Sequence, residues 1–264
     1  MSMVAPAERA AEISAALAPR LAPGEVRIGT SGWSYEHWRG VLYAPGVASR
    51  RWLEVYAEAF DTVELNTSFY HWPRVDSFRS WAAKLAPGFL LTVKGPRGLT
   101  HAKGALDPAR WTERLADGLD GLGDRAGPLL LQLPPDRARD DAFLDALLRA
   151  VPAGRRAAVE LRHPSWVDDH VFALLEEYEA SYCVMSGAHL PCELRATSDQ
   201  VYVRFHGPDP EHLYVGGYSD DDLDWWAARI REWQDAGRSV LCYFNNDGEG
   251  HAVYDARRLR DRLT

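Results

Sequence analysis

The sequence has few cysteines and no long apolar run. Three cysteines, Cys183, Cys192 and Cys242, stand among 264 residues, and none belongs to a C-x-x-C pair. Such a sparse and odd set argues against a disulfide framework and against a thiolate zinc site. No run of 18 apolar residues occurs, so we expect no membrane-spanning helix. The N-terminal stretch lacks the apolar core and cleavage site of a secretory signal, which makes the cytoplasm the expected compartment.

The sequence also lacks a net positive charge and two motifs of common enzyme classes. Its formal net charge is -8 at pH 7. This charge disfavours a broad electrostatic grip on nucleic acid or on an anionic membrane, although a local basic pocket stays open. There is no G-x-x-x-x-G-K-S/T loop for nucleotide phosphates and no G-x-S-x-G elbow for a serine nucleophile. Ser31 follows a predicted strand, but no His–Asp relay can be assigned to it.

What the sequence does contain is a regular alternation of short apolar runs with longer helical patterns. Strands that alternate with helices form parallel sheets. Eight strands over about 230 residues favour closure into a TIM-like (β/α) barrel. The predicted strands cover residues 26–31, 61–66, 89–94, 128–133, 157–162, 181–185, 201–206 and 239–245. The predicted helices cover residues 49–59, 74–85, 108–121, 139–150, 168–178, 220–236 and 253–263.

Two segments depart from this alternation. Residues 1–25 contain the helix-forming stretch AERAAEISAALA, which predicts a helical arm or a disordered extension. Residues 186–200 contain Gly187, Pro191 and at most a short helix, so we expect the barrel to be irregular between its sixth and seventh strands. We therefore predict one barrel domain over residues 26–264, preceded by the arm.

Nearly every predicted strand ends in a hydrogen-bonding side chain. In such barrels the functional site lies at the C-terminal ends of the strands. Side chains alternate along a strand, so Glu64, Glu160 and Arg204 lie on faces opposite their apolar neighbours and point into the barrel. Buried charges are costly unless they are paired, so we expect these groups to converge. The polar strand ends are Thr30, Ser31, Glu64, Asn66, Lys94, Gln132, Glu160, Arg162, Arg204, His206, Asn245 and Asn246.

Aromatic side chains follow several of these strands, in the segments SGWSYEHW, SFYHWP and HPSW. Aromatic rings beside hydrogen-bonding groups suit a sugar or a base. Lysine and arginine suit a phosphate or a carboxylate. The predicted ligand-binding residues are therefore Asn66, Lys94, Gln132, Arg162, Arg204, Asn245, Asn246, Trp33, Tyr35 and Tyr70.

Seven ordered motifs resemble those of one known family. They are IGTSGWSYEHWRGVLYAP, FDTVELNTSFYHWP, FLLTVKGPRGLTH, GPLLLQLPP, AVELRHPSW, YVRFHG and YFNNDGEGHAV. From about residue 26 to its end the chain looks like the YecE-like family, catalogued as domain of unknown function 72. The resemblance implies a TIM-barrel-like fold and implies no established activity.

Three functions stay open at this point. First, a hydrolase or lyase would act on a small anionic or hydroxyl-rich ligand, with Glu64 and Glu160 as acid and base and His206 as a rival base. Second, a metal-dependent phosphodiesterase, akin to barrel endonucleases, would use the same groups together with His163. Basic and amide neighbours are poor metal ligands, and we expect neither a metal nor a cofactor.

Third, the protein would bind an anionic metabolite without turning it over. In every case the expected partner is a small polar or anionic ligand. We expect no membrane partner and regard nucleic acid as the weaker candidate, while the sequence leaves the oligomeric state open.

Overall fold

The computed structural model describes residues 20–264, and these form a barrel of eight parallel strands. The sheet order is β1-β8-β7-β6-β5-β4-β3-β2, so each strand from β2 onward pairs with its successor along the chain, and β8 pairs with β1. The predicted barrel is thereby confirmed. Most of the predicted arm, residues 1–19, lies outside the described residues. The strands are β1 (Val26–Thr30), β2 (Thr62–Leu65), β3 (Leu90–Lys94), β4 (Ala126–Gln132), β5 (Ala157–Glu160), β6 (Ser181–Ser186), β7 (Gln200–Phe205) and β8 (Ser239–Phe244).

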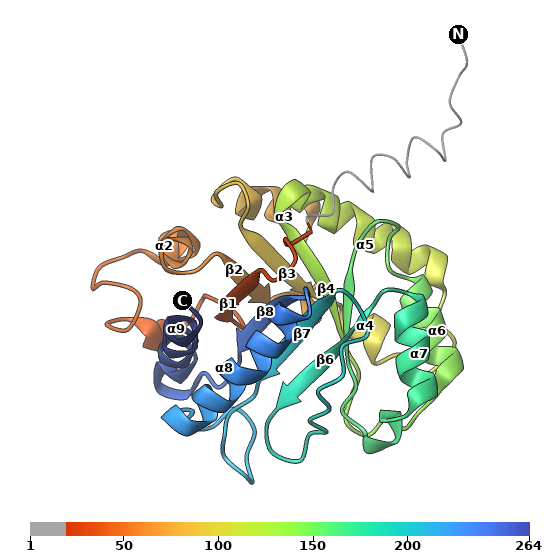
Figure 1. Cartoon of the computed structure of the whole chain (residues 1–264). Coiled ribbons are helices and arrows are strands. Elements are labelled where there is room, and N and C mark those ends of the chain that lie inside the picture. Colours follow the sequence, from red (N-terminus) through yellow and green to blue (C-terminus); the bar gives the residue numbers. More distant parts are fainter. Residues whose placement is uncertain (1–19) are drawn as a thin grey trace.

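Helices surround the strands (Figure 1). They are α2 (Trp52–Ala59), α3 (Val75–Ala82), α4 (Arg97–Thr100), α5 (Pro108–Leu122), α6 (Asp141–Arg149), α7 (Asp169–Glu177), α8 (Asp220–Asp235) and α9 (His251–Leu263). All seven predicted helices are present, and the single turn α4 was not predicted. Residues 187–199 between β6 and β7 contain no helix, which confirms the expected irregularity there. In residues 20–264 no helix has both the length and the apolar character needed to cross a membrane.

Single turns of 3-10 helix occupy several connections. They are η1 (Glu36–Trp38), η2 (Ser49–Arg51), η3 (Thr67–Phe69), η4 (Gly123–Arg125), η5 (Pro164–Trp166) and η6 (Gly248–Gly250). Three of them, η1, η3 and η6, follow β1, β2 and β8, so they shape the loops at the C-terminal end of the barrel.

Local sequence signals set where the helices begin. Asp107 caps α5 by accepting a hydrogen bond from the backbone N–H of Arg110, and Pro108 occupies the first helical position. Ser219 and Asp222 form a reciprocal capping box at the start of α8. Because these caps satisfy N–H groups that have no partner inside the helix, they fix the length of the loops that precede the helices.

The barrel closes between β1 and β2 by one short contact. The backbone N–H of Gly32 donates to the carbonyl oxygen of Glu64 at 2.7 Å, beside an isolated bridge between Ser31 and Glu64. At Gly29 a Cβ atom would lie 2.2 Å from the carbonyl oxygen of Thr62. Only glycine permits this approach, so Gly29 lets the first strand meet the second.

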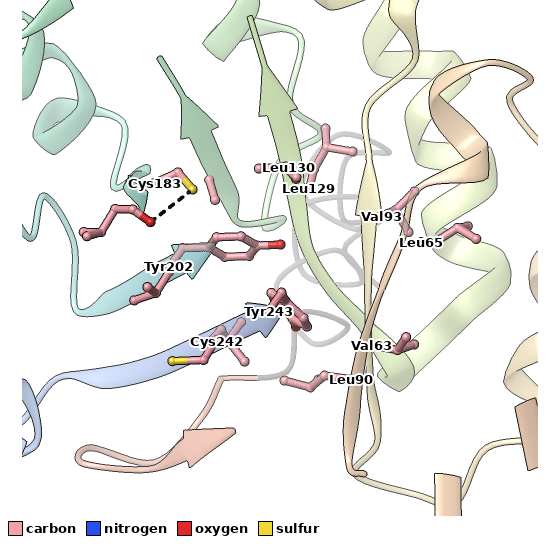
Figure 2. Close-up of a cluster of buried hydrophobic side chains, with 14 of the residues drawn as sticks. Val63, Leu65, Leu90, Val93, Leu129, Leu130, Cys183, Tyr202, Cys242 and Tyr243 are labelled. Atoms are coloured by element: carbon pink, nitrogen blue, oxygen red, sulfur yellow. Dashed lines mark hydrogen bonds between the residues drawn. The ribbon is translucent and has the colours of Figure 1, made fainter. Parts of the chain in front are cut away.

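The two faces of the strands differ in polarity. Val63 and Leu65 are buried apolar side chains that point out of the barrel, whereas Tyr202 and Tyr243 point into it (Figure 2). The Tyr243 hydroxyl shares hydrogen bonds with Thr62 Oγ1 at 2.6 Å and with Thr92 Oγ1 at 2.9 Å. The layer of the barrel interior around Tyr243 is therefore polar and internally hydrogen-bonded.

Candidate functional site

Arg204, near the end of β7, stands at the centre of a buried charge cluster. Its Nε and Nη2 donate to the two carboxylate oxygens of Glu64 at 3.0 and 2.6 Å. Its Nη1 donates to Glu160 Oε2 at 2.5 Å. All three side chains are 0% exposed. The predicted convergence of lumen-facing charges thus occurs, with one arginine bridging carboxylates from β2 and β5.

The remaining acceptor positions of the buried charge cluster (Glu64, Glu160, Arg162 and Arg204) are also occupied. Ser31 Oγ and Tyr202 Oη donate to Glu64 at 2.5 and 2.6 Å. Arg162 Nε donates to Glu160 Oε1 at 2.6 Å. A fork that binds both oxygens of a carboxylate is geometrically specific, so the cluster holds its members in fixed positions.

Electrostatics keep Glu160 and Arg204 in their charged forms. Burial raises the pKa of Glu160, but Arg162, Arg204 and His206 outweigh it and hold that pKa well below its usual range. Burial opposes the charge on Arg204, yet Glu160 and Glu64 raise its pKa well above the ordinary value. Groups that stay charged across the whole working pH range are poorly suited to exchange protons.

His206 lies against the same cluster as a neutral ring. Its Nδ1 is 3.3 Å from Asn245 Nδ2, and its Nε2 is 3.5 Å from Glu160 Oε1. Nε2 is buried without a hydrogen-bond partner among residues 20–264. Burial, reinforced by Arg204 and Arg162 and opposed by Glu160, lowers the pKa of His206 to about 4. If Asn245 donates to Nδ1, the ring proton sits on Nε2 and faces the carboxylate.

A cavity of about 380 Å³ opens at the C-terminal ends of the strands, and we call it the mouth cavity. Its walls come from the segments that end or follow β2, β3, β7 and β8. Within residues 20–264, the Asn66 Oδ1 atom is buried there without a partner, whereas Tyr70 stands at the rim and is 74% exposed. The lining residues are Asn66, Phe69, Tyr70, Lys94, Tyr214, Asn245, Asp247 and Gly248.

Lys94 is the cation of the mouth cavity. Its Nζ lies 4.7 Å from the centroid of the Phe69 ring, and it forms no ion pair with a carboxylate in residues 20–264. Burial, followed by repulsion from Arg204, lowers the pKa of Lys94 to about 8, although Glu160 and Glu64 act in the opposite sense. Lys94 is therefore an ammonium group that loses its proton readily.

Asp247 is the carboxylate of the mouth cavity, and it pairs with a histidine. Trp38 Nε1 donates to Asp247 Oδ1 at 2.6 Å, and His37 Nε2 lies 3.0 Å from Oδ2. Burial raises the pKa of Asp247 to about 6, against the opposing effects of Trp38 and His37. The site residues predicted from the sequence include neither Asp247 nor His37. The pairing of β1 with β8 brings together the loops that contain His37 and Asp247. A closed barrel predicted from the sequence could therefore have indicated this pair.

Tyr214 completes the wall with an unusual backbone conformation. Its φ is +71°, a region that costs a bulky residue energy and persists where the surrounding structure enforces it. The backbone N–H of Tyr214 donates to the carbonyl oxygen of His206. Its hydroxyl accepts a hydrogen bond from Arg162 Nη1 at 3.2 Å. Tyr214 thus links the mouth cavity to the buried charge cluster.

The predicted ligand-binding residues divide into a first group, in the mouth cavity or the buried charge cluster, and a second group outside both. Asn66, Tyr70, Lys94 and Asn245 line the mouth cavity, and Arg162 and Arg204 belong to the buried charge cluster. Trp33, Tyr35, Gln132 and Asn246 do not line the cavity.

Contacts explain where that second group lies. Trp33 packs edge-on against Trp81, and the Tyr35 hydroxyl donates to the carbonyl oxygen of Ser31 at 2.7 Å. Asn246 is fully buried, and its Nδ2 donates to Asp255 Oδ2 at 2.8 Å. Gln132 is buried at the end of β4, opposite Glu160 in the strand register.

The described residues offer no ready metal centre. In residues 20–264 no group of three or more His, Cys, Asp or Glu side chains could hold a metal ion. The space between Glu64 and Glu160, where the sequence places two potential ligands, is taken by the Arg204 guanidinium.

A parallel barrel with a polar mouth at the C-terminal strand ends defines a TIM-barrel-like protein. The model of the family described as "Protein of unknown function DUF72" matches residues 27–264, and the chain belongs to this family. The resemblance seen in the seven motifs is thereby confirmed.

Individual relatives agree with the family assignment. The chain is 26% identical over 270 residues to UPF0759 protein YunF of Bacillus subtilis, covering 90% of this chain and 94% of YunF. It is 28% identical over 142 residues to UPF0759 protein YecE of Escherichia coli K12, covering 53% and 50%. A DUF72 family protein from Thermotoga maritima has a similar structure, with a TM-score of 0.82, 28% identity, and coverage of 90% of this chain and 99% of that one.

Proposed function

We propose that the protein is an enzyme that binds a small hydroxyl-rich or anionic molecule in the mouth cavity and transfers protons through Asp247 and Lys94. One observation carries this proposal. The same cavity contains a carboxyl group with a pKa of about 6 and a lysine with a pKa of about 8. Titratable groups whose environments move their pKa values toward neutrality are concentrated at functional sites.

The chemistry follows from the two values. Near pH 7 most Asp247 is a carboxylate and can accept a proton, whereas most Lys94 is an ammonium and can donate one or stabilise a developing oxyanion. His37 and Trp38 fix the orientation of the Asp247 carboxylate. A base and an acid poised on opposite sides of pH 7 suit hydrolysis or elimination, the hydrolase or lyase chemistry that the sequence suggests.

The other walls suit a hydroxyl-rich ligand. Asn66 and Asn245 present amide groups. The Asn66 Oδ1 atom has no partner within residues 20–264, so it can accept a hydrogen bond from a ligand hydroxyl. Tyr70 and Phe69 offer ring faces for the apolar side of a sugar-like ring. These features support a small polar ligand better than a polymer, because a cavity of about 380 Å³ encloses only a small molecule.

In this proposal the buried charge cluster positions groups and does not exchange protons. The acid–base roles assigned to Glu64, Glu160 and His206 from sequence stay predictions. We place proton transfer at Asp247 and Lys94 instead, because Glu64 and Glu160 are enclosed and fully hydrogen-bonded to Arg204 and its neighbours.

The test compares Asp247→Asn and Lys94→Met with the control Asp235→Asn, which makes the same chemical change at an exposed position at the end of α8. The wild-type protein and these three variants are assayed on glycosides, sugar phosphates and sugar acids. We expect turnover of at least one compound, and a loss of roughly 100-fold or more in kcat for both mouth variants. Full turnover by both variants contradicts the proposal. So does a compound that raises the Tm of the wild-type protein and is never converted, since that result identifies a binding protein.

A further inference from the structure

A second cavity lies beside the mouth, at the C-terminal ends of β3 and β4. Its volume is about 410 Å³, and its lining residues are Arg97, His101, Lys103, Pro134, Asp136 and Arg137. One wall is α4 and the turn after it, which follow β3. The other wall is the segment that follows β4. Because β3 and β4 are paired neighbours, the two walls face one space on the same end of the barrel as the mouth cavity.

The charge of this second cavity is positive. Its lining contains three cations, Arg97, Lys103 and Arg137, and one carboxylate, that of Asp136. None of the three cations forms an ion pair with a carboxylate in the part of the chain that the structure describes. In a protein of net charge -8, a concave group of unpaired cations indicates a local preference for anions.

Arg137 is held in place before any ligand arrives. Its Nη2 donates to the carbonyl oxygen of Ala102, and its guanidinium lies 3.9 Å from the centroid of the Phe143 ring. Its Nε is buried without a hydrogen-bond partner among residues 20–264. A guanidinium that is stacked and partly bonded loses little freedom when it binds an anion.

The two cavities share a wall of aromatic rings. Phe69 lines the mouth cavity and lies 5.0 Å from the ring of His101, which lines the second cavity. Burial lowers the pKa of His101, and Arg97, Lys94 and Arg137 lower it further against Asp136. The cations of both cavities thus act on His101, and the 5.0 Å between the Phe69 and His101 rings makes the two cavities neighbours at the same end of the barrel.

We propose that the second cavity binds a phosphate group of the substrate while the hydroxyl-rich part of that substrate occupies the mouth cavity. Three cations against one carboxylate match a phosphate monoester dianion better than a carboxylate, which a single arginine fork satisfies. The inference rests on the proposed function, since it names the substrate class of that site as phosphorylated polyols or sugars.

The proposed phosphate subsite lies at other loops than those that bind phosphate in many barrels. In many barrels a phosphate binds at the loops after the seventh and eighth strands. Here those loops carry Asp209, Glu211, Asp247 and Glu249, which repel an anion. The positive loops follow the third and fourth strands instead.

Inorganic phosphate is the first probe, measured by isothermal titration calorimetry. The test variant is Arg97→Ala/Lys103→Ala, because both side chains are exposed and the fold does not depend on them. The control is Arg50→Ala/Arg110→Ala, which removes two exposed charges elsewhere. We expect the test variant to weaken phosphate binding roughly tenfold or more, and the control variant and Asp247→Asn to leave it unchanged. Absence of binding to the wild-type protein, or equal binding by test and control variants, overturns the inference.

Two further arms separate this inference from the alternatives. If Lys94→Met abolishes phosphate binding while the test variant keeps it, the phosphate sits in the mouth cavity. The inference then fails and the proposed function stands. A single-stranded oligonucleotide that binds more tightly than ribose 5-phosphate assigns the cations to nucleic acid and also overturns the inference. Loss of turnover in Asp247→Asn with intact phosphate binding is the result expected if both proposals hold.

Discussion

The buried charge cluster and the mouth cavity contain the same kinds of charged groups in opposite states. In the cluster, Glu64, Glu160 and Arg204 are 0% exposed and satisfy one another. In the mouth cavity, Lys94 has no carboxylate partner in residues 20–264, and Asp247 is held by a histidine and a tryptophan. Burial with a charged partner fixes the ionised form, whereas burial without a full partner moves a pKa toward neutrality.

This difference separates the groups that hold the site from those that can exchange protons. The carboxylates of Glu64 and Glu160 accept hydrogen bonds from arginine and are closed off from solvent, so they offer no free position for a substrate atom. A cavity with open hydrogen-bonding atoms and titratable groups has several. We therefore propose a structural role for the buried charge cluster and proton exchange for the mouth cavity.

Removal of one cation from each region tests the difference between the two regions most strongly. Arg204→Met leaves two carboxylates buried without their partner, and we expect it to lower the free energy of unfolding by about 3–5 kcal/mol. Lys94→Met removes an unpaired cation, and we expect it to change stability by less than about 1 kcal/mol. Urea unfolding followed by circular dichroism measures both. Equal effects of the two substitutions would remove the distinction between the regions.

A second prediction concerns the loss of stability that protonation of His206 causes at acid pH. The folded-state pKa of His206 is about 4, below the ordinary value of about 6.5. The stability due to its neutral form is therefore present above pH 6.5 and is lost as the pH falls toward 4. We expect this loss to reach roughly 3 kcal/mol, and His206→Asn to lack it. Unfolding measured at pH 7 and pH 4.5 for both proteins checks the sign, and parallel pH curves would contradict it.

The pH dependence of stability that is due to Asp247 should be smaller than that due to His206 and opposite in sign. Its pKa of about 6 in the folded protein lies above the ordinary value of about 3.9. The stability due to its neutral form is therefore full below about pH 4 and is lost as the pH rises through 6. Relative to the wild-type protein, Asp247→Asn should gain about 1 kcal/mol between pH 4.5 and pH 8, after allowance for solvent screening. Asp235→Asn, at its exposed position, should gain nothing over the same interval.

The smallest expected effect is a shift in the pH at which one lysine is labelled. The sequence contains three lysines, Lys84, Lys94 and Lys103, so each can be followed by mass spectrometry after reductive methylation. Labelling of Lys94 should reach half its maximal rate near pH 8, the pKa that burial and Arg204 give it. Lys84 and Lys103 serve as internal references for the reagent. A half-maximal pH above 10 for Lys94 would show that its ammonium is not perturbed.

Strand periodicity predicted the buried charge cluster because it depends on local order alone. In a parallel strand, a side chain two residues away lies on the same face, so Glu160 and Arg162 could be assigned to the barrel interior without coordinates. Because buried charges must be paired, the sequence predicts that these groups converge, and the structure shows Arg204 between the two carboxylates. The hydrophobic alternation that gave the eight strands rests on the same periodicity.

Apart from Lys94, which ends β3, the residues that line the mouth cavity lie outside the strands, where no such periodicity exists. His37 and Asp247 are 210 residues apart along the chain, and only the pairing of β1 with β8 brings them together. Tyr214 reaches the wall through a backbone conformation that its residue type does not favour. Asn246 lies two residues beyond the end of β8 and bonds to Asp255, because the loop turns its side chain toward α9.

Carbon-13 NMR titration of the carboxyl groups tests the central claim most directly, since it needs no substrate. If proton exchange belongs to the mouth cavity, the side-chain carboxyl of Asp247 titrates near pH 6, and that of Glu160 stays ionised to well below its usual pKa. Asp247→Asn assigns the first signal and Glu160→Gln the second. A Glu160 signal that titrates near neutral pH, with Asp247 ionised throughout, would return the acid–base role to the buried charge cluster and contradict the account.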